Sequence, residues 1–248
     1  GSEMCIRDRK MYCEARYGGY PDAMEEAWKL FRKTAYSSLY SYPRFTWQTV
    51  IPDQRRISKI DLSVDYLQAI RLYASCADEL KSSELYRNDL IEFVSYYVAA
   101  KAENFYKQAL KDDLENRVLA AQRNLQQTVD LLMDVDRLLA SHPLYRLEEW
   151  VELARNSGTT LQEKDAYEAN AKRLITSWGG IQEDYAARFW SGLIKDYYIP
   201  RIQLYFTKDR DKIREWEEQW ITSPWSNSTT PFDDPVKAAL NLIEKTNK

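Results

Sequence analysis

Carboxylates and aromatic rings are the side chains in this sequence whose types and spacing could act on a ligand. Asp130 and Asp134 lie one helical turn apart, and Glu183 and Asp184 are adjacent. Two carboxyl groups about 5–5.5 Å apart can hydrolyse a glycoside with retention, one attacking the anomeric carbon while the other serves as acid and then as base. Charged residues at these spacings are more typical of a solvated helix face or a helix cap. Spacing alone therefore predicts no catalytic pair.

Sites that depend on histidine are limited by His142, the only histidine of the chain. A di-iron site in a helix bundle needs Glu-x-x-His from each of two helices, and a His-Glu-x-x-His zinc site also needs two histidines. A serine or cysteine nucleophile would have to use His142 as its base, but that residue precedes Pro143 in a segment typical of a helix end, so we interpret it as structural. The cysteines are too few and too irregularly spaced for a disulfide framework or a thiolate metal site: Cys5, Cys13 and Cys76. We predict no metal ligands and no cofactor.

The aromatic content is the stronger chemical signal, with 18 tyrosines and 8 tryptophans. The rings of tyrosine and tryptophan are largely apolar but carry one polar group each. Sugars are suitable partners, because they present apolar C–H faces between hydroxyl groups. Trp178 stands at an expected helix end beside two glycines, where its position fits a functional residue as well as a core residue. Four apolar residues recur at helical spacing and are interpreted as core: Phe189, Trp190, Leu193 and Tyr197.

Composition predicts an all-α protein. Glycine contributes 7 of the 248 residues, well below its usual share of about 7%, whereas helix-forming residues are plentiful. A chain of this length can form one large domain. The 35 basic and 38 acidic residues leave a net charge of −3, which provides no overall field to attract nucleic acid or an anionic membrane. No apolar run reaches the about 18 residues of a membrane span, so neither kind of partner is predicted.

A long segment without helix breakers predicts the main helices. Neither glycine nor proline occurs between Pro52 and Pro143, and a single helix of that length would extend about 135 Å, far more than a globular domain. The segment must therefore fold back on itself. Apolar residues at helical spacing predict long antiparallel helices: one from Asp61 or Ser63 to Ala77, one over 84–110 and one over 113–141.

Shorter helices are expected on either side of this segment. Pro21 and Asp22 open a helix that extends to about Tyr40, with Asp22 as its N-cap and Glu25 as the capping-box partner. Residues 41–60 are expected to be irregular. The remaining elements are predicted to be a helix over 148–155, a helix over 165–177 ended by Gly179 and Gly180, a helix from Asp184 that Pro200 kinks, a loop over 223–234 and a last helix from Pro235.

The first residues are typical of a non-native leader. Gly1 and Ser2 match a cloning scar, and residues 3–9 resemble translated sequencing adapter. We therefore expect residues 1–10 to be foreign and residues 11–248 to form the α-helical domain. If this is right, the natural protein continued upstream.

The block over 167–206 is the most specific part of the sequence. Trp178 is followed by Gly179 at the break between two expected helices, and Asp184, Tyr185 and Ala186 come shortly after. This block resembles the C-terminal helical domain of glycoside hydrolase family 89, the α-N-acetylglucosaminidases. Weaker similarities extend over nearly the whole chain: Ala15-Arg16-Tyr17-Gly18, Pro21-Asp22-Ala23 with Trp28, Leu85-Tyr86-Arg87-Asn88-Asp89-Leu90, and 131–139 before the short helix with Trp150.

The resemblance implies that this chain is part of a larger enzyme, a retaining exo-α-N-acetylglucosaminidase. In that family a small N-terminal domain and a (β/α)₈ barrel precede the helical domain, and both catalytic glutamates belong to the barrel. It follows that this chain has no catalytic residue and is inactive alone. Its partners are the barrel and glycans with terminal α-linked N-acetylglucosamine. The helical domain closes one side of the sugar pocket with Trp178 and Tyr185. An exported location is implied in a bacterium and a lysosomal one in an animal.

The sequence departs from the animal enzymes at two places. The segment between Trp178 and Tyr185 is shorter, which leaves open whether Ile181 or Gln182 also faces the sugar. Residues 91–95 read Ile-Glu-Phe-Val-Ser where the animal enzymes carry a polar Thr-Arg-Gln sequence. A different contact to the barrel or to the surroundings of the sugar follows from this change.

A second hypothesis is a free-standing helical module whose aromatic surface binds a partner protein or another carbohydrate. Sequence upstream of the fragment separates the two hypotheses, because only the glycosidase requires a barrel with glutamates at its strand ends.

Overall fold

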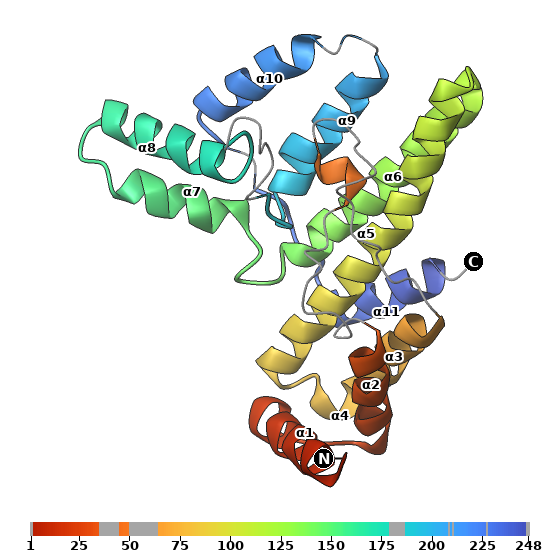
Figure 1. The fold of residues 1–248 in the computed structure, drawn as a ribbon. Helices are drawn as coiled ribbons and strands as arrows, with labels where there is room; N and C mark the ends of the chain where they lie inside the picture. Colours follow the sequence, from red (N-terminus) through yellow and green to blue (C-terminus); the bar gives the residue numbers. More distant parts are fainter. Residues whose placement is uncertain are drawn as a thin grey trace. The chain divides into compact units, whose positions relative to one another are not determined.

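The structure is a computed structural model that describes residues 2–34, 45–49, 64–178, 187–207, 209, 211–226 and 228–246. These residues form helices joined by turns and loops, and they include no β-strand (Figure 1). The predicted all-α class, with long helices and shorter helices packed in one domain, is confirmed. No helix in the described part of the chain is long and apolar enough to cross a membrane.

Within this domain the chain divides into two compact units, which are described separately. Unit 1 comprises Gly1–Pro43, Ser58–Lys101 and Phe232–Lys248, and unit 2 comprises Arg44–Ile57 and Ala102–Pro231. The helices of unit 1 are α1 (Ser2–Tyr17), α2 (Asp22–Lys33), α3 (Val64–Ser75), α4 (Ala77–Leu80), the first part of α5 (Glu84–Leu114) and α11 (Pro235–Lys245).

Aromatic rings fill the core of unit 1. The rings of Phe31 on α2 and Phe93 on α5 have centroids 4.6 Å apart, and Tyr73 on α3 meets Phe93 edge-on at 5.2 Å. Tyr73 also stacks on Tyr86 with centroids 4.8 Å apart. Burial of these large side chains from regularly spaced helical positions joins α2, α3 and α5, since each ring removes a large apolar area from water.

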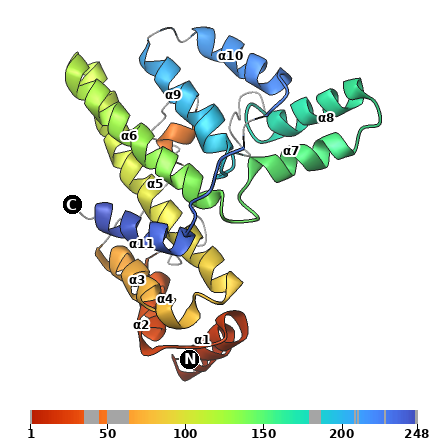
Figure 2. The same ribbon diagram turned by 180° about the vertical axis from the view of Figure 1, so that it is seen from behind.

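Unit 2 contains the rest of α5, the 3₁₀-helix η1 (Thr46–Gln48) and the helices that lie between α5 and α11 in the chain. These are α6 (Val118–Leu139), α7 (Leu147–Asn156), α8 (Leu161–Leu174), the π-helix η4 (Ile194–Tyr198), α9 (Ile199–Phe206) and α10 (Asp211–Thr222). Helix α7 lies beside α8, and α10 contacts both α8 and α9 (Figure 2). The short helix predicted over 148–155 is thus confirmed as α7.

Helices α5 and α6 are antiparallel, as predicted, but the second begins later than expected. Asn124 Nδ2 donates to Asp112 Oδ2 at 2.8 Å, and farther along α6 the Thr128 hydroxyl reaches the carbonyl of Ala102, which comes earlier in α5. The expected start at residue 113 is wrong, because α5 continues to Leu114. The turn is made by Asn116 with φ of +57°, a conformation that asparagine tolerates better than most residues.

The ends of other helices also differ from the sequence prediction. Pro21 occupies the N-cap of α2 and Asp22 is its first helical residue, so the predicted cap bond is not formed. Helix α2 ends at Lys33, and the expected continuation to Tyr40 falls outside the described residues. The proposed caps Asp61 and Ser63 lie outside them as well.

Helix α8 begins four residues before the predicted Asp165. Thr160 is its N-cap and accepts a hydrogen bond from the backbone of Glu163, whose side chain returns a bond to the backbone of Thr160. This reciprocal capping box fixes the start of the helix. The last helix is as expected, because α11 starts at Pro235 and the Asp234 side chain accepts from the backbone N–H of Lys237.

A kink is predicted at Pro200, and in the structure the helix widens into a π-helical turn just before this residue. Proline has no N–H for the carbonyl one turn earlier, at Asp196, and the chain is π-helical over η4 before α9 resumes at Ile199. Residues 187–192 are not helical, so the helix expected from Asp184 does not extend through this segment.

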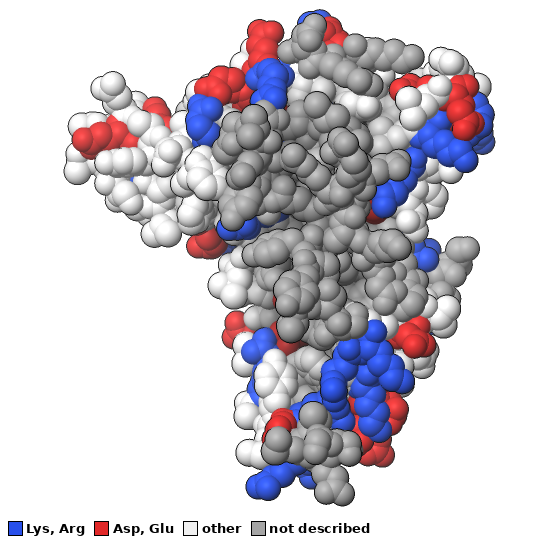
Figure 3. Space-filling view, viewed as in Figure 1, with Lys and Arg blue, Asp and Glu red and all other residues white. Residues whose placement is uncertain are grey.

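The described surface carries acidic and basic side chains close to one another, as the small net charge requires (Figure 3). On α2, for example, Lys29 pairs with both Glu25 and Glu26, at 3.0 and 2.7 Å. Mixed charges of this kind supply no single-sign field for a polyanionic partner.

Candidate functional site

The predicted pocket residue Trp178 lies just after the end of α8 and is half-exposed, at 46% of its maximum. Its backbone N–H bonds to the carbonyl of Arg173 at 3.0 Å, and the Thr176 hydroxyl bonds to the carbonyl of Lys172 at 2.7 Å. The backbone is therefore held while the large side chain is kept out of the core. The second predicted pocket residue, Tyr185, lies outside the described residues, together with the rest of 179–186.

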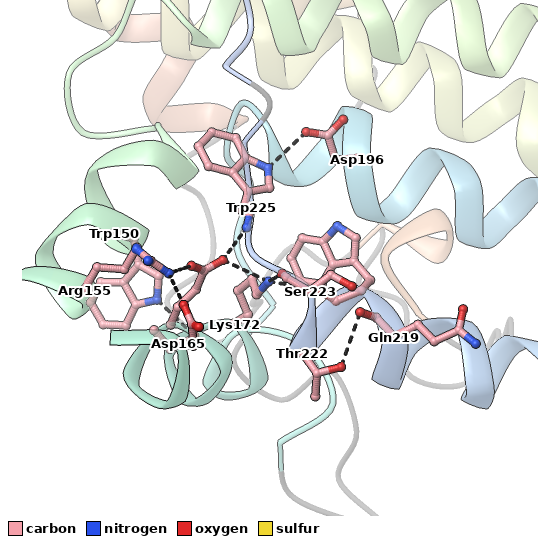
Figure 4. A network of polar contacts seen from close by, with 12 residues as sticks. Trp150, Arg155, Asp165, Lys172, Asp196, Gln219, Thr222, Ser223 and Trp225 are labelled. Atoms are coloured by element: carbon pink, nitrogen blue, oxygen red, sulfur yellow. Dashed lines mark hydrogen bonds and ion pairs between the residues drawn. The ribbon is translucent and has the colours of Figure 1, made fainter. Parts of the chain in front are cut away.

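A buried ion pair holds α8 in place. Glu168 and Lys172 have 2% and 1% of their side chains exposed, with 3.1 Å between carboxylate and ammonium. Arg155 of α7 also pairs with Glu168, at 2.6 Å (Figure 4). Lys172 Nζ donates to the backbone carbonyls of Trp220, at 2.9 Å, and Ser223. Burial lowers the pKa of Lys172, whereas the hydrogen bond and the charge of Glu168 raise it. The charged form of Lys172 is therefore stabilised in the interior by Glu168. We call Glu168 and Lys172 the upstream anchor.

A second buried carboxylate, Asp136 of α6, fixes the chain on the other side of 179–186. Its Oδ1 accepts from the backbone N–H groups of Gly192 at 2.8 Å and Lys195 at 3.0 Å. Its Oδ2 accepts from the hydroxyls of Thr229 at 2.6 Å and Ser191 at 3.3 Å. Burial raises the pKa of Asp136, while these hydrogen bonds lower it. We call Asp136 with residues 191–196 the downstream anchor.

Residues 188 and 189 are supported by the short segment 45–49. The carbonyl of Arg188 accepts from Tyr198 Oη at 3.0 Å and from Gln48 Nε2 at 3.4 Å. The ring of Phe189 packs on Phe45 and Trp47, with centroids 5.8 and 6.3 Å away. These contacts hold Arg188 and Phe189, which follow the segment 179–186 in the chain.

Two further buried charges fasten segment 45–49 itself. Glu103 of α5 accepts from the backbone N–H of Thr46, at 2.9 Å to one oxygen and 3.0 Å to the other. Arg201 of α9 donates to the carbonyl of Gln48 at 2.7 Å and pairs with Glu217 of α10 at 3.0 Å. The carboxylate of Glu217 also accepts from Tyr197 Oη at 2.7 Å.

A family model for the alpha-N-acetylglucosaminidase (NAGLU) C-terminal domain matches residues 9–245. The chain belongs to this family. The human α-N-acetylglucosaminidase is 28% identical in an alignment of 220 positions that covers 82% of this chain and 28% of the human protein.

Solved structures of a family 89 glycoside hydrolase from Clostridium perfringens have the same fold. The complex with PUGNAc has a TM-score of 0.83 at 22% identity, and the complex with 2-acetamido-1,2-dideoxynojirmycin has a TM-score of 0.82 at 21% identity. Each match covers 96% of this chain and 31% of the solved chain. The chain therefore spans less than a third of the length of these relatives.

Two of the weaker family similarities in the sequence meet in unit 1. Asp89 accepts from Arg16 Nε at 2.8 Å and Nη2 at 2.5 Å, and from Tyr17 Oη at 2.5 Å. The front block with Arg16 and Tyr17 and the middle block with Asp89 thus form one hydrogen-bonded cluster.

The other residues that the sequence offered for catalysis or metal binding make contacts that indicate structural roles. Asp130 is exposed and accepts from Gln126 at 2.7 Å, as expected for a solvated face. His142 is buried, and its Nδ1 accepts from the backbone of Leu144 at 3.1 Å. Burial raises the pKa of Cys13 to about 12 and that of Cys76 to about 11, so neither thiol is ionised near neutrality. Over the described ranges no cluster of His, Cys, Asp or Glu could hold a metal ion.

Two of the four residues that were predicted to be core at helical spacing are in the core. Leu193 and Tyr197 are buried, whereas Phe189 and Trp190 are only half-buried. The reason is that residues 187–190 are not helical, so a helical spacing does not place them on one face.

The buried charges of the two anchors flank the candidate site, and sequence reasoning missed them. A signal was present for Asp136, which lies four residues after Leu132 and three before Leu139 and so falls on the apolar face of α6. A charged residue at such a position needs a buried partner.

Proposed function

We propose that this chain is the C-terminal accessory domain of a retaining exo-α-N-acetylglucosaminidase. The observation that carries the proposal is the family match over 9–245 in a chain that spans under a third of its relatives. The remaining length in the parent protein would supply a (β/α)₈ barrel with both catalytic glutamates. The helical domain would pack on that barrel and close one side of the pocket for a terminal α-linked N-acetylglucosamine.

In this proposal Trp178 and Tyr185 shape the sugar subsite and transfer no proton. Tryptophan offers a rigid apolar face and a single N–H donor, and tyrosine has an ordinary pKa near 10, unsuited to acid–base work at neutral or acidic pH. The half-exposure of Trp178 after a firmly held helix supports this role. Leu174, in the last turn of α8, is also exposed at 36%, which supports an apolar contact with a further domain.

The location of the catalytic groups is tested with the isolated chain. We expect no hydrolysis of an aryl α-N-acetylglucosaminide by the purified fragment, and turnover by the complete parent protein under the same conditions. Turnover by the fragment that survives controls for contaminating enzyme would overturn the accessory role. A parent sequence with no barrel upstream would instead favour the free-standing module.

The pocket role is tested by steady-state kinetics of the complete protein. Trp178→Ala should lower kcat/KM by roughly 10- to 10³-fold, or about 1.4–4 kcal/mol of transition-state stabilisation. The matched control is Tyr167→Ala, because Tyr167 is a 45% exposed aromatic residue on α8, the helix that precedes Trp178. An unchanged kcat/KM for folded Trp178→Ala and Tyr185→Phe would remove both from the pocket. Complete inactivation of folded Tyr185→Phe would show a chemical role for its hydroxyl.

A further inference from the structure

The segment between α10 and α11 connects the two anchors. We name residues 223–226 and 228–229 the strap. Its first carbonyl, of Ser223, accepts from Lys172 of the upstream anchor. The N–H of Trp225 donates to Glu168 of the same anchor at 2.5 Å. At its other end Thr229 donates to Asp136 of the downstream anchor at 2.6 Å.

Trp225 contacts both anchors by itself. Its backbone N–H bonds to Glu168 on α8, and its indole Nε1–H bonds to Asp196 Oδ2 on η4 at 3.1 Å (Figure 4). Its ring also lies directly against the backbone of Gly192. A Cβ built on Gly192 would be 3.2 Å from Trp225 Cζ2 and 3.1 Å from Leu147 Cβ, tighter than nine in ten real contacts. Glycine at 192, which also has a φ of +83°, therefore permits this close approach of the ring.

The indole N–H of Trp225 also stabilises the charge of the Asp196 carboxylate. The Asp196 side chain is only 12% exposed, and burial raises its pKa, whereas Lys195 and the Trp225 hydrogen bond lower it. A donor placed on a largely buried carboxylate stabilises the ionised form. Phenylalanine in place of Trp225 would keep the ring and lose this bond.

We propose that Trp225 is a positioning residue that holds the two ends of 179–186 in register and so sets the geometry of the sugar pocket. The proposal rests on the proposed function for the pocket, but the positioning itself is a property of this chain. Trp225 does not touch the substrate; it acts through Glu168 and Asp196.

The positioning is tested by amide hydrogen exchange on the 248-residue chain. Trp225→Ala should accelerate exchange roughly tenfold in peptides covering 173–178 and in peptides covering 191–198. The matched control is Trp28→Ala, because Trp28 is a half-exposed tryptophan on α2 whose ring packs against Tyr12, Phe31 and Phe93 in unit 1. Unchanged exchange in both regions, or equal acceleration by Trp28→Ala, would overturn the proposal.

The effect on the pocket is tested in the complete enzyme. Trp225→Ala and Trp225→Phe should raise KM by roughly 3- to 30-fold with kcat changed by less than about twofold, because a displaced Trp178 weakens ground-state and transition-state binding alike. A purely structural role would reduce the folded fraction, which lowers apparent kcat and leaves KM unchanged. That second pattern would overturn the link to the pocket.

The acceptor of the indole bond provides a finer control. Asp196→Asn keeps an oxygen for the indole N–H and should resemble the parent, whereas Asp196→Ala should reproduce Trp225→Phe. Equal effects of Asn and Ala would show that the hydrogen bond is not the cause. If the unsubstituted complete protein has no glycosidase activity, the proposed function fails, while the exchange result still decides whether Trp225 holds both anchors.

Discussion

The two units of this domain fill their interiors with different kinds of side chain. Unit 1 relies on aromatic packing, and among its described residues the buried charged group is Asp89. Unit 2 buries many charged side chains: Glu103, Asp112, Asp136, Glu168, Lys172, Arg201 and Glu217. Trp178, the described member of the predicted pocket, belongs to the unit with the buried charges.

The difference follows from where the backbone is irregular. A helix satisfies its own N–H and C=O groups, whereas a buried loop must find other partners. Glu103 accepts from the backbone of Thr46, Asp136 from that of Gly192 and Lys195, and Arg201 donates to the carbonyl of Gln48. Glu103, Asp136 and Arg201 thus mark places where non-helical chain enters the interior.

The largest expected effect is the loss of the carboxylate at Asp136. Asp136→Ala should destabilise the chain by about 3–5 kcal/mol, because it leaves two backbone N–H groups and a hydroxyl buried without an acceptor. Chemical denaturation followed by circular dichroism measures the change. Asp136→Asn, which keeps one oxygen for Gly192 and Lys195, should lose less than half as much. Equal losses would mean that charge, and not backbone satisfaction, is decisive.

A smaller effect is expected for the carboxylate of unit 1. Asp89→Ala should cost about 1.5–3 kcal/mol by the same measurement, because it breaks hydrogen bonds to a charged partner. The Arg16 side chain is 32% exposed and can be rehydrated, which is not possible for the backbone around Asp136. Asp78→Ala, at a fully solvated position beside Lys81, is the control and should change little. A loss as large as that of Asp136→Ala would contradict the contrast between the units.

Within the aromatic core a single hydroxyl should matter less still. Tyr86 Oη donates to the carbonyl of Tyr73 at 2.7 Å, and that carbonyl also accepts from the backbone of Cys76. Tyr86→Phe should therefore cost about 1 kcal/mol or less in the free energy of unfolding. A cost above about 2 kcal/mol would show that unit 1 also depends on buried polar bonds.

The smallest expected effect depends on pH and concerns the start of α8. The Thr159 hydroxyl and the backbone N–H groups of Thr159 and Thr160 hold the pKa of Glu163 down, at about 2. Because this value lies below that of the unfolded chain, the ionised carboxylate stabilises the fold above about pH 4.3, and this stabilisation is lost as the pH falls through about 2. Glu163→Gln should lower Tm by about 1–2 °C at pH 6.

Thermal melts of both proteins at pH 6, 4 and 2 test this sign. The difference in Tm should shrink as the pH falls, since protonation removes the same interaction from the parent chain. A difference that grows toward pH 2 would refute the capping explanation.

The local elements of the fold could be predicted from the sequence, within limits. Apolar spacing in a segment without glycine or proline indicated α5, whereas Gly158 and Pro235 indicated the end of α7 and the start of α11. The start of α8 was missed although Thr160 and Glu163 have the capping-box spacing, and the turn at Asn116 was missed because it contains neither glycine nor proline. Asp22 failed as a cap because Pro21 already occupies that position.

The candidate site could be predicted only in part. The position of Trp178 beside two glycines left open whether this residue is in the core, and the structure shows it 46% exposed. The pocket roles of Trp178 and Tyr185 stay predictions. The anchors could not be derived locally, because Glu168 meets the backbone 57 residues later in the chain and Asp136 meets Thr229 after 93 residues. Such pairs depend on the complete tertiary fold.

The division of the chain also has a consequence for the order of its synthesis. Unit 1 is completed by α11, which is encoded after all of unit 2 and buries Val236, Ala239, Leu242 and Ile243. Since a ribosome makes the chain from its N-terminus and domains fold as their segments appear, unit 2 can close while unit 1 still lacks its last helix. A nascent chain arrested before residue 235 should therefore carry a protease-resistant unit 2 beside an unfinished unit 1 whose apolar surface recruits chaperones.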